Sequence, residues 1–303
     1  MTKIEHDIKA AKDRVANYDK PYFHIAVNYL KENIGNNAEI LDLGAGNGEF
    51  GVLAREKTGA RVTCLDYAEP HLETLRSLGF ETIKADFDKS GELKEVGKRF
   101  QNRFDVVTGF EFIEHIFGLD DFLTFAHTVL KPNGKIIIST PNLDYSFFHL
   151  YSLFMGNIPV GEGHHVRFFN RKRLTQALVL DGFDIVKELS HGRGTAYWDR
   201  MITPRNKLKE FLIRGLGRLV YELTPNSSSK KYRKLMIVGE KANVQPLGLD
   251  QTWREPNYAG LPNEDKQTIF SRLTQHKEKG LFNDMPIFSK FFENESCKYI
   301  KKC

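Results

Sequence analysis

The sequence predicts an α/β fold in which a mostly parallel sheet is covered by helices on both faces. Short apolar runs that are typical of buried strands recur between residues 40 and 240, and helix-like segments separate them. The first run, residues 40–43, leads into three glycines at alternate positions and then into a helix-like segment at 49–57. Strands that alternate with helices in this way favour parallel pairing under two layers of helices.

Each element is predicted by its own pattern. Residues 1–37 are expected to be helical, because Tyr22, Ala26, Tyr29 and Leu30 recur at helical spacing. Further helices are expected at 49–57, 120–130 and 171–180, the last of them capped by Asn170. The strands are expected at residues 40–43, 61–65, 82–85, 104–110, 135–140, 184–189 and 235–239.

Composition and length indicate an ordinary globular protein. The chain has 303 residues, of which 41% are hydrophobic and 27% charged, enough for one domain with additions. It contains no apolar run of the ~20 residues that a membrane span needs. The N-terminus lacks the apolar core of a signal peptide, and the three cysteines show no metal-ligand spacing, so we expect a reduced, cytoplasmic setting. A net charge of +5 is weak support for an anionic partner.

The glycine turn carries the most functional information. Gly44, Gly46 and Gly48 follow a predicted strand and precede a helix, a geometry that brings backbone N–H groups to a ligand. The nicotinamide fingerprint G-x-G-x-x-G would require a third glycine where the chain has Glu49. Asp42 beside the turn would repel a pyrophosphate and favour the ammonium of an amino acid. The loop therefore suits a ligand with an aminoacyl end.

At these residues the chain resembles the class I S-adenosylmethionine (SAM) methyltransferases. The resemblance implies that Asp42 and the three glycines hold the methionine end of the cofactor. Asp66 ends the second predicted strand, 22 residues after Gly44, close to the ~20 expected for an acid that binds ribose. Tyr67 follows it and would lie against adenine. The alternative for Asp66, and for Asp86 below, is a helix or turn cap.

The third and fourth strands supply the remaining candidates for cofactor binding. Asp86 and Phe87 follow the third strand, where the family has an acid and a hydrophobe that contact adenine. Phe110 ends the fourth strand and completes the expected set.

A longer block is similar to the branch that includes the ubiquinone-biosynthesis O-methyltransferases. The resemblance covers residues 35–240 and is most specific at 39–51 and 105–142. It implies a seven-stranded Rossmann-like sheet with helical lid insertions at 143–169 and 195–234. The predicted organisation is thus a helical cap at 1–37, a methyltransferase domain at 38–240 and an extension at 241–303. The shared landmarks are Glu114-His115, Lys131-Pro132-Asn133-Gly134, Ser139-Thr140-Pro141-Asn142, His165-Val166-Arg167-Phe168-Phe169 and Asp181-Gly182-Phe183.

Candidates for the chemistry follow the fourth strand, in the pattern E-x-x-E-H. If the segment turns as a helix, Glu111, Glu114 and His115 share a face. With His165 they would form a site for a divalent cation such as Mg, Mn or Zn. Some relatives use such an arrangement, and alignment to them favours His165, with His164 as the alternative. The cation would lower the pKa of an acceptor hydroxyl.

Two other interpretations of these residues stay open. His115 or His165 would act on the substrate without a metal, with Glu114 beside them, or all of them would have structural roles. In either catalytic case, methyl transfer requires the nucleophile, the methyl group and the sulfur to be aligned and shielded from water.

The expected function is SAM-dependent methyl transfer to an oxygen of a small molecule, with nitrogen and carbon as alternative acceptor atoms. Aromatic residues of the first insertion would line the acceptor site or pack the lid. The amphipathic basic helix at 207–218 would be a solvated helix or would contact a membrane surface. An RNA 3′-terminal 2′-O-methyltransferase and a non-catalytic SAM-binding scaffold are the alternatives. Nucleic acid is not expected as a partner, because no aromatic and basic stacking platform is evident. The aromatic residues of the first insertion that would line the acceptor site or pack the lid are Phe147, Phe148, Tyr151 and Phe154.

Overall fold

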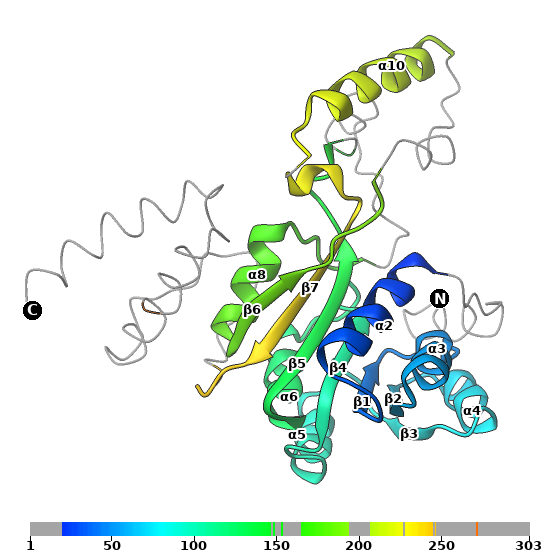
Figure 1. The fold of residues 1–303 in the computed structure, drawn as a ribbon, viewed down its shortest axis with the longest axis vertical. Helices are drawn as coiled ribbons and strands as arrows, with labels where there is room; N and C mark the ends of the chain where they lie inside the picture. The colour runs from blue at the N-terminus through cyan, green and yellow to red at the C-terminus, as the bar shows by residue number, and fades with distance from the viewer. Residues whose placement is uncertain are drawn as a thin grey trace, which may run out of the picture.

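A seven-stranded sheet organises the protein in the computed structural model (Figure 1). The structure describes residues 20–146, 165–193, 207–226 and 228–244, together with residues 148, 153, 246 and 271. The strand order is β3-β2-β1-β4-β5-β7-β6. The pairs along β3, β2, β1, β4 and β5 are parallel, and β7 is antiparallel to both of its neighbours. The predicted mostly parallel seven-stranded sheet is confirmed.

The strands lie close to their predicted positions. The main difference is in β5, which begins five residues early because the Lys131–Gly134 turn interrupts it rather than preceding it. Phe104 pairs with Leu130 and Val106 pairs with Lys135, so the four residues of the turn bulge out of the register. The bounds are β1 Glu39–Leu43, β2 Arg61–Asp66, β3 Glu81–Lys84, β4 Phe104–Phe110, β5 Leu130–Pro141, β6 Phe183–Glu188 and β7 Lys234–Lys241.

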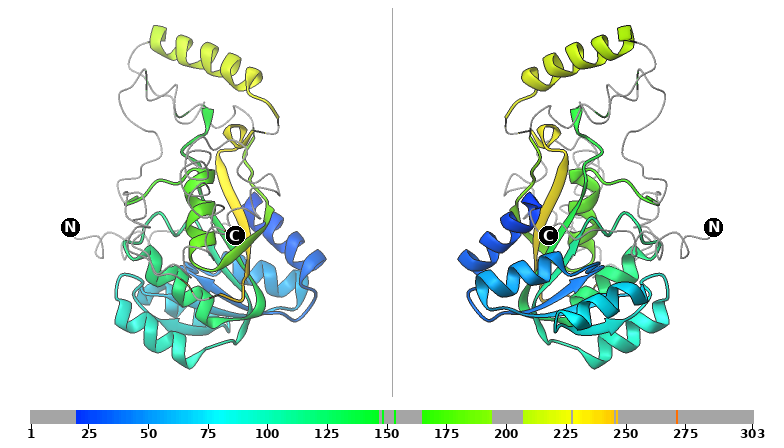
Figure 2. Two further views of the ribbon diagram at one scale, coloured as in Figure 1. Left: turned by 90° about the vertical axis from the view of Figure 1, so that its left-hand side faces the viewer. Right: turned by 90° about the vertical axis from the view of Figure 1, so that its right-hand side faces the viewer.

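Helices cover both faces of the sheet. One face packs against α2, α3 and α4, and the other packs against α5, α6 and α8. Figure 2 shows α2, in dark blue, and α8, in green, on opposite sides of the strands. Residues 1–19 of the predicted N-terminal helix lie outside the described part of the chain. The bounds are α2 Pro21–Asn33, α3 Glu49–Thr58, α4 Glu69–Ser77, α5 Ser90–Arg99, α6 Leu119–Val129, α8 Arg171–Leu180, α10 Lys207–Leu223 and the short 3₁₀ helix η1 Ser229–Lys231.

The three isoleucines of β5 show how the sequence fills both layers. Ile136 and Ile138 belong to the core under α5, α6 and α8, and Ile137 belongs to the core under α2, α3 and α4. All three side chains are fully buried. Because successive side chains of a strand point to opposite faces, an uninterrupted apolar run is required where both faces are covered.

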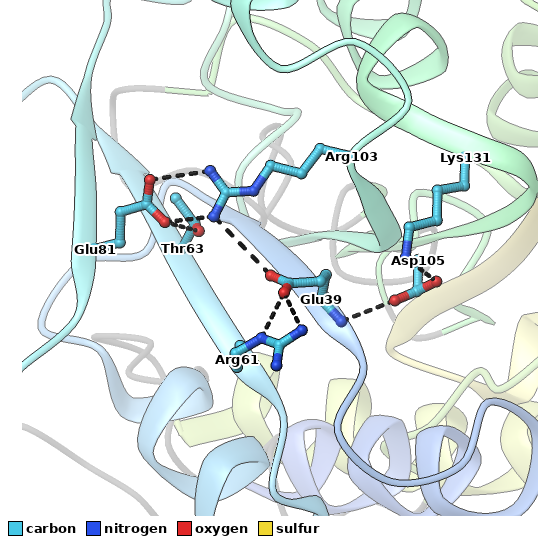
Figure 3. A network of polar contacts seen from close by, with 7 residues as sticks. All are labelled: Glu39, Arg61, Thr63, Glu81, Arg103, Asp105 and Lys131. Carbon is cyan, nitrogen blue, oxygen red and sulfur yellow. Dashed lines mark hydrogen bonds and ion pairs between the residues drawn. The ribbon is translucent and has the colours of Figure 1, made fainter.

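A polar network closes the edge of the sheet at which β1 to β4 begin (Figure 3). Arg103 donates two hydrogen bonds to the carboxylate of Glu81, at 3.0 and 2.6 Å, and Thr63 donates a third. Asp105 accepts from the backbone N–H of Glu39 and from Lys131. The Arg103 hydrogen bonds hold the pKa of Glu81 below its usual value. These contacts tie strand starts together on the side opposite the candidate site.

The inserted segments are described only in part. Of the first insertion, residues 143–146, 148, 153 and 165–169 are described, so Phe147, Tyr151 and Phe154 lie outside. Phe148 is buried and packs edge-to-face against Tyr145. In the second insertion, α10 lies at one end of the molecule, beyond the point where β5 ends and β7 begins (Figures 1 and 2). Among the described helices, none combines the length and the apolar character of a membrane span. The predicted domain boundaries stay predictions.

Candidate functional site

The glycine turn lies at the carboxyl edge of the sheet, the edge at which β1, β2 and β4 end. Gly44, Gly46 and Gly48 have φ angles of 64°, 56° and 81°, which only glycine adopts without strain. A Cβ on Gly44 would lie 2.4 Å from Cδ2 of Phe112. A Cβ on Gly48 would lie 2.8 Å from Leu75. The turn therefore needs glycine for both backbone conformation and space.

Asp42 is buried at the base of this turn. Its Oδ1 accepts a hydrogen bond of 2.7 Å from the hydroxyl of Thr108 in β4. Burial, with the nearby charges of Glu49 and Asp66, raises the pKa of Asp42 to about 7. Lys20 lies 3.6 Å from Glu49 and supplies a partial counter-charge. Three carboxyl groups gathered under a turn favour a cationic ligand, which fits the ammonium of a methionine moiety.

Asp66 connects the turn to the start of α4. Its carboxylate accepts hydrogen bonds from the N–H of Gly46, at 3.0 Å, and from the N–H of Ala68, at 2.9 Å. Nδ1 of His71 lies 3.2 Å from the same carboxylate. Tyr67 is half-buried beside it. The structure thus brings the predicted ribose acid to the glycine turn, as the sequence predicts.

The adenine candidates differ in exposure. Asp86 is partly exposed, and its Oδ1 accepts from the N–H of Asp88. Phe87 is buried and packs against Phe112 and Phe122, with ring centroids 4.4 and 6.3 Å away. The ring of Phe87 is a core element here, so its stacking on adenine stays a prediction.

Phe110 lies at the same edge within an aromatic cluster. Its ring centroid is 4.7 Å from that of Phe50 in α3 and 5.4 Å from that of Phe23 in α2. Tyr22 contacts both Phe110 and His191. The half-buried Phe110 therefore forms part of an apolar wall between the first helices and the end of β4.

Glu111 does not join the predicted metal ligands. The segment 111–117 forms turns rather than a helix, and Glu111 has a left-handed φ of 52°. Its carboxylate forms an ion pair with Lys234 of β7 and accepts a hydrogen bond from Ser139 of β5. The prediction that positions 111, 114 and 115 share a helical face is therefore wrong. Lys234 can pair with Glu111 because β7 is antiparallel to β5 and therefore begins at the edge where β4 and β5 end.

Glu114, His115 and His165 do converge. One potential ligand atom from each lies within 4.8 Å of the other two. The rings of His115 and His165 have centroids 4.7 Å apart. His164, the alternative ligand, lies outside the described residues. The cluster thus contains three of the four predicted ligands.

Backbone contacts hold the cluster in place. The N–H groups of Val166 and Arg167 donate to the carbonyl of Glu114, at 2.8 and 3.2 Å, which fixes His165 beside the turn after β4. Thr140 of β5 donates to the Glu114 carboxylate at 3.0 Å. Burial raises the pKa of Glu114 to about 8. Its other oxygen, Oε1, accepts no hydrogen bond from the described residues.

The donor set suits a divalent cation. Two imidazoles and a carboxylate are common ligands of transition metals. Because Oε1 of Glu114 is buried and accepts no hydrogen bond from the described residues, a bound cation would give it a partner. Without a cation, the same groups can exchange a proton with a bound hydroxyl.

Sequence reasoning missed several contributors. Three carboxyl groups of the site are held by residues on strands distant in sequence. Glu111 pairs with Lys234, Glu114 accepts from Thr140, and Asp42 accepts from Thr108. The sequence did offer an indication for Glu49, because this residue stands where a dinucleotide-binding fingerprint would have glycine. It offered no indication for Phe112, since the place of Phe112 beside Gly44 depends on the turn after β4.

Comparisons with known proteins agree with this geometry. A family profile described as "Methyltransferase domain" matches residues 17–188, more than half of the chain. The ubiquinone biosynthesis O-methyltransferase of Azotobacter vinelandii is 31% identical over 120 residues, which cover 39% of this chain and 51% of that protein. The mitochondrial ubiquinone biosynthesis O-methyltransferase of Bos taurus is 28% identical over 174 residues, 53% of this chain and 45% of that protein. The matches thus span about half the length of these curated relatives.

Among solved structures, a SAM dependent methyltransferase from Archaeoglobus fulgidus superposes with a TM-score of 0.51 at 21% identity. The match covers 78% of this chain and 99% of the other, and it shows a shared fold. Fold, glycine turn and family profile lead to one conclusion: the chain belongs to the methyltransferase-domain family and has the fold of the class I SAM-dependent methyltransferases.

Proposed function

We propose that this methyltransferase acts on a hydroxyl oxygen of a small-molecule acceptor, and that Glu114, His115 and His165 form the site that receives the hydroxyl. The observation that carries the proposal is the convergence of these three side chains at the carboxyl edge that also holds the glycine turn. A hydroxyl must lose its proton during methyl transfer, whereas a neutral amine can attack first, so a proton-accepting or cation-binding cluster favours oxygen. The relatives named O-methyltransferases support the same acceptor atom.

The roles of the cofactor residues follow from their contacts. Asp42 and the glycine turn would hold the methionine end, and Asp66 would exchange its bond to the Gly46 N–H for bonds to the ribose hydroxyls. Asp86 and Tyr67 would contact the adenosine part. Since Asp66 also supports the turn, we expect Asp66→Ala to abolish detectable SAM binding by calorimetry while the protein stays folded. Unchanged affinity in the folded variant would refute the cofactor assignment.

We also propose that Glu114, His115 and His165 hold a divalent cation. Held there, it would supply Lewis acidity to the acceptor hydroxyl. Glu114 would then be ionised, although burial alone favours its neutral form. Without a cation, His115 would accept the proton itself.

The metal content of the purified protein separates these two mechanisms. We expect titration with Mg²⁺, Mn²⁺ and Zn²⁺ to give one bound ion per chain, and His165→Ala to lose it. His24→Ala is the matched control, because His24 is exposed on α2 and outside the cluster. Equal metal content in wild type and His165→Ala would exclude the metal site.

The acceptor atom is tested by product analysis. Incubation with SAM and a panel of phenols, each paired with the aniline of the same shape, should yield S-adenosylhomocysteine and methyl ethers from the phenols. Selective methylation of the anilines would contradict the proposal. Selective methylation of a single-stranded RNA 3′ end would favour the RNA alternative, and SAM binding without any turnover would favour the scaffold.

A further inference from the structure

His71, in the first turn of α4, contacts the carboxylate that we propose to bind ribose. Its Nδ1 lies 3.2 Å from Oδ2 of Asp66. Both side chains are largely buried, with 13% of the His71 side chain and 6% of the Asp66 side chain exposed. Because a carboxylate oxygen only accepts hydrogen bonds, Nδ1 of His71 must carry a hydrogen and donate it. The two side chains are therefore joined by a charge-assisted hydrogen bond that is sheltered from water.

The backbone at the start of α4 fixes the His71 ring relative to Asp66. The N–H of His71 donates to the carbonyl of Ala68, at 3.0 Å, and the N–H of Ala68 donates to Oδ1 of Asp66, at 2.9 Å. Nε2 of His71 is buried and has no hydrogen-bond partner among the described residues. The contact with Asp66 is therefore the polar interaction that the His71 side chain provides.

The donors around Asp66 leave room for two ribose hydroxyls. A carboxylate has about four lone-pair positions. Within the part of the chain that the structure describes, Oδ1 accepts from Ala68 alone, whereas Oδ2 accepts from Gly46 and from His71. One position on Oδ1 is therefore open, and a second opens on Oδ2 when the bond to the Gly46 N–H is exchanged. The bond from His71 can persist throughout, so His71 can hold the carboxylate while the hydroxyls bind.

A helix-capping role for Asp66 accounts for only part of these contacts. Capping explains the bond from the Ala68 N–H at the start of α4. It does not explain the bond from Gly46, which lies in the glycine turn, 20 residues earlier in the chain. The three donors come from the turn, from the start of the helix and from an imidazole, so together they fix the plane of the carboxylate at the cofactor site.

We propose that His71 is a positioning residue for ribose, whose Nδ1–H holds the plane of the Asp66 carboxylate so that both ribose hydroxyls of the cofactor can donate to it. The inference deepens the proposed function and rests on Asp66 as the ribose-binding acid. A carboxylate that is already oriented loses little freedom when the ligand binds. A ligand without the hydroxyls gains nothing from that orientation, so the effect of His71 depends on the ribose of the ligand.

Calorimetry on the full-length protein with S-adenosylhomocysteine and its 2′,3′-dideoxy analogue tests the inference. We expect the wild type to prefer S-adenosylhomocysteine by about a hundredfold, since the analogue loses two hydrogen bonds to a charged group. His71→Leu should reduce that preference by about tenfold and leave the affinity for the analogue within about twofold of the wild-type value. A side chain with only a structural role would instead lower both affinities by the same factor.

Two further variants distinguish the two ring nitrogens of His71. His71→Asn places an amide near the position of Nδ1 and should restore most of the preference for S-adenosylhomocysteine. His71→Gln places its amide near the position of Nε2 and should behave like His71→Leu. Thr74→Ala is the matched control on α4, because the Thr74 hydroxyl is exposed and donates to the carbonyl of Pro70, at 3.0 Å. It should keep the wild-type preference.

The results separate failure of this inference from failure of the cofactor assignment. A wild type that prefers S-adenosylhomocysteine, with a His71→Leu variant that keeps the full preference, would overturn the role of His71 and leave Asp66 as the ribose acid. An equal loss of both affinities, or rescue by Gln and not by Asn, would also overturn it. If His71→Leu does not fold, the comparison of the Asn and Gln variants gives the same decision. Equal binding of the two ligands by the wild type would refute the assignment of Asp66 and this inference with it.

Discussion

Gly44 illustrates how much the cofactor site depends on one missing side chain. It combines a positive φ with direct contact to Phe112, so that both backbone and space exclude a Cβ. Gly35 shares the first property alone, with a φ of 93° and no atom within 4 Å of the position that a Cβ would occupy. Alanine substitutions at Gly44 and Gly35 therefore separate the effect of backbone strain from the effect of filling the space beside Phe112.

Gly44→Ala should therefore eliminate SAM binding and lower the free energy of unfolding by about 2–4 kcal/mol, from strain plus displacement of Phe112. Gly35→Ala should lower it by about 1 kcal/mol and leave SAM affinity unchanged. Calorimetry and urea unfolding measure both quantities. Retention of SAM affinity in Gly44→Ala would contradict the close approach of Phe112.

Lys234 and Glu111 form a partly desolvated charge pair whose members are distant in sequence. Burial lowers the pKa of the Lys234 ammonium to about 7, and the Glu111 carboxylate acts in the opposite direction. Lys234→Met should lower the free energy of unfolding by about 2–3 kcal/mol, because a carboxylate loses its cation. Glu111→Gln in the same chain should restore part of that loss. Urea unfolding of both single variants and the double variant gives the coupling, and strictly additive effects would show that the pair does not interact.

Among the elements, the junction of β5 with η1 and β7 depends on Asn142. Its side-chain amide donates to the carbonyls of Ser229 and Tyr232, at 2.9 and 2.8 Å, and its Oδ1 accepts from the N–H of Asp144. The side chain is fully buried. One residue after β5 thus positions both the start of β7 and the loop that leads into the first insertion.

Asn142→Ala should lower the free energy of unfolding by about 2–4 kcal/mol, because it leaves buried polar groups without partners. The exposed Asn28 on α2 provides the control, and Asn28→Ala should change the value by less than about 0.5 kcal/mol. Thermal or urea unfolding makes the comparison. Equal effects of the two substitutions would show that the three hydrogen bonds do not stabilise the junction.

At the scale of the whole molecule, the protonation state of Asp42 makes both the free energy of unfolding and ligand binding depend on pH. Its folded pKa of about 7 lies above its ordinary value of 3.8, so the native state binds more protons than the unfolded state between these values. The stability that neutral Asp42 contributes is full below the lower value and is lost as the pH rises through about 7. Glu114 acts in the same direction, because its pKa is also raised, so its contribution to stability is lost as the pH rises through about 8.

A ligand ammonium beside Asp42 would favour its carboxylate, so SAM binding at about pH 6 should release a proton. Calorimetry in two buffers of different ionisation enthalpy measures that release. Asp42→Asn should reduce it, whereas Asp86→Asn, at a partly exposed acid, should not. Equal proton release by Asp42→Asn and the wild type would show that Asp42 does not face the ammonium.

The sequence predicts position well where the determinants are local. It places the glycine turn, Asp42 and Asp66 at one edge of the sheet, because each stands at the end of an apolar run and the ends of parallel strands gather there. Their roles in cofactor binding stay predictions. The sequence could not pair Glu111 with Lys234, since that contact requires knowing that β7 runs antiparallel between β5 and β6. It also could not reveal the left-handed turn at Glu111, which replaces the helical face expected for the E-x-x-E-H motif. The family profile supports methyl transfer, and the acceptor remains a proposal.

The reversed direction of β7 has a consequence for how this molecule can diversify. Because β6 ends and β7 begins at the carboxyl edge, the connection between them leaves and re-enters the sheet beside the reaction site. The structure describes one bridge within this connection, between His191 and Lys234, so the residues between these two can change in length without breaking it. New specificities can therefore arise by exchange of the segment that carries α10, while the glycine turn and Asp66, at the ends of β1 and β2, stay unchanged.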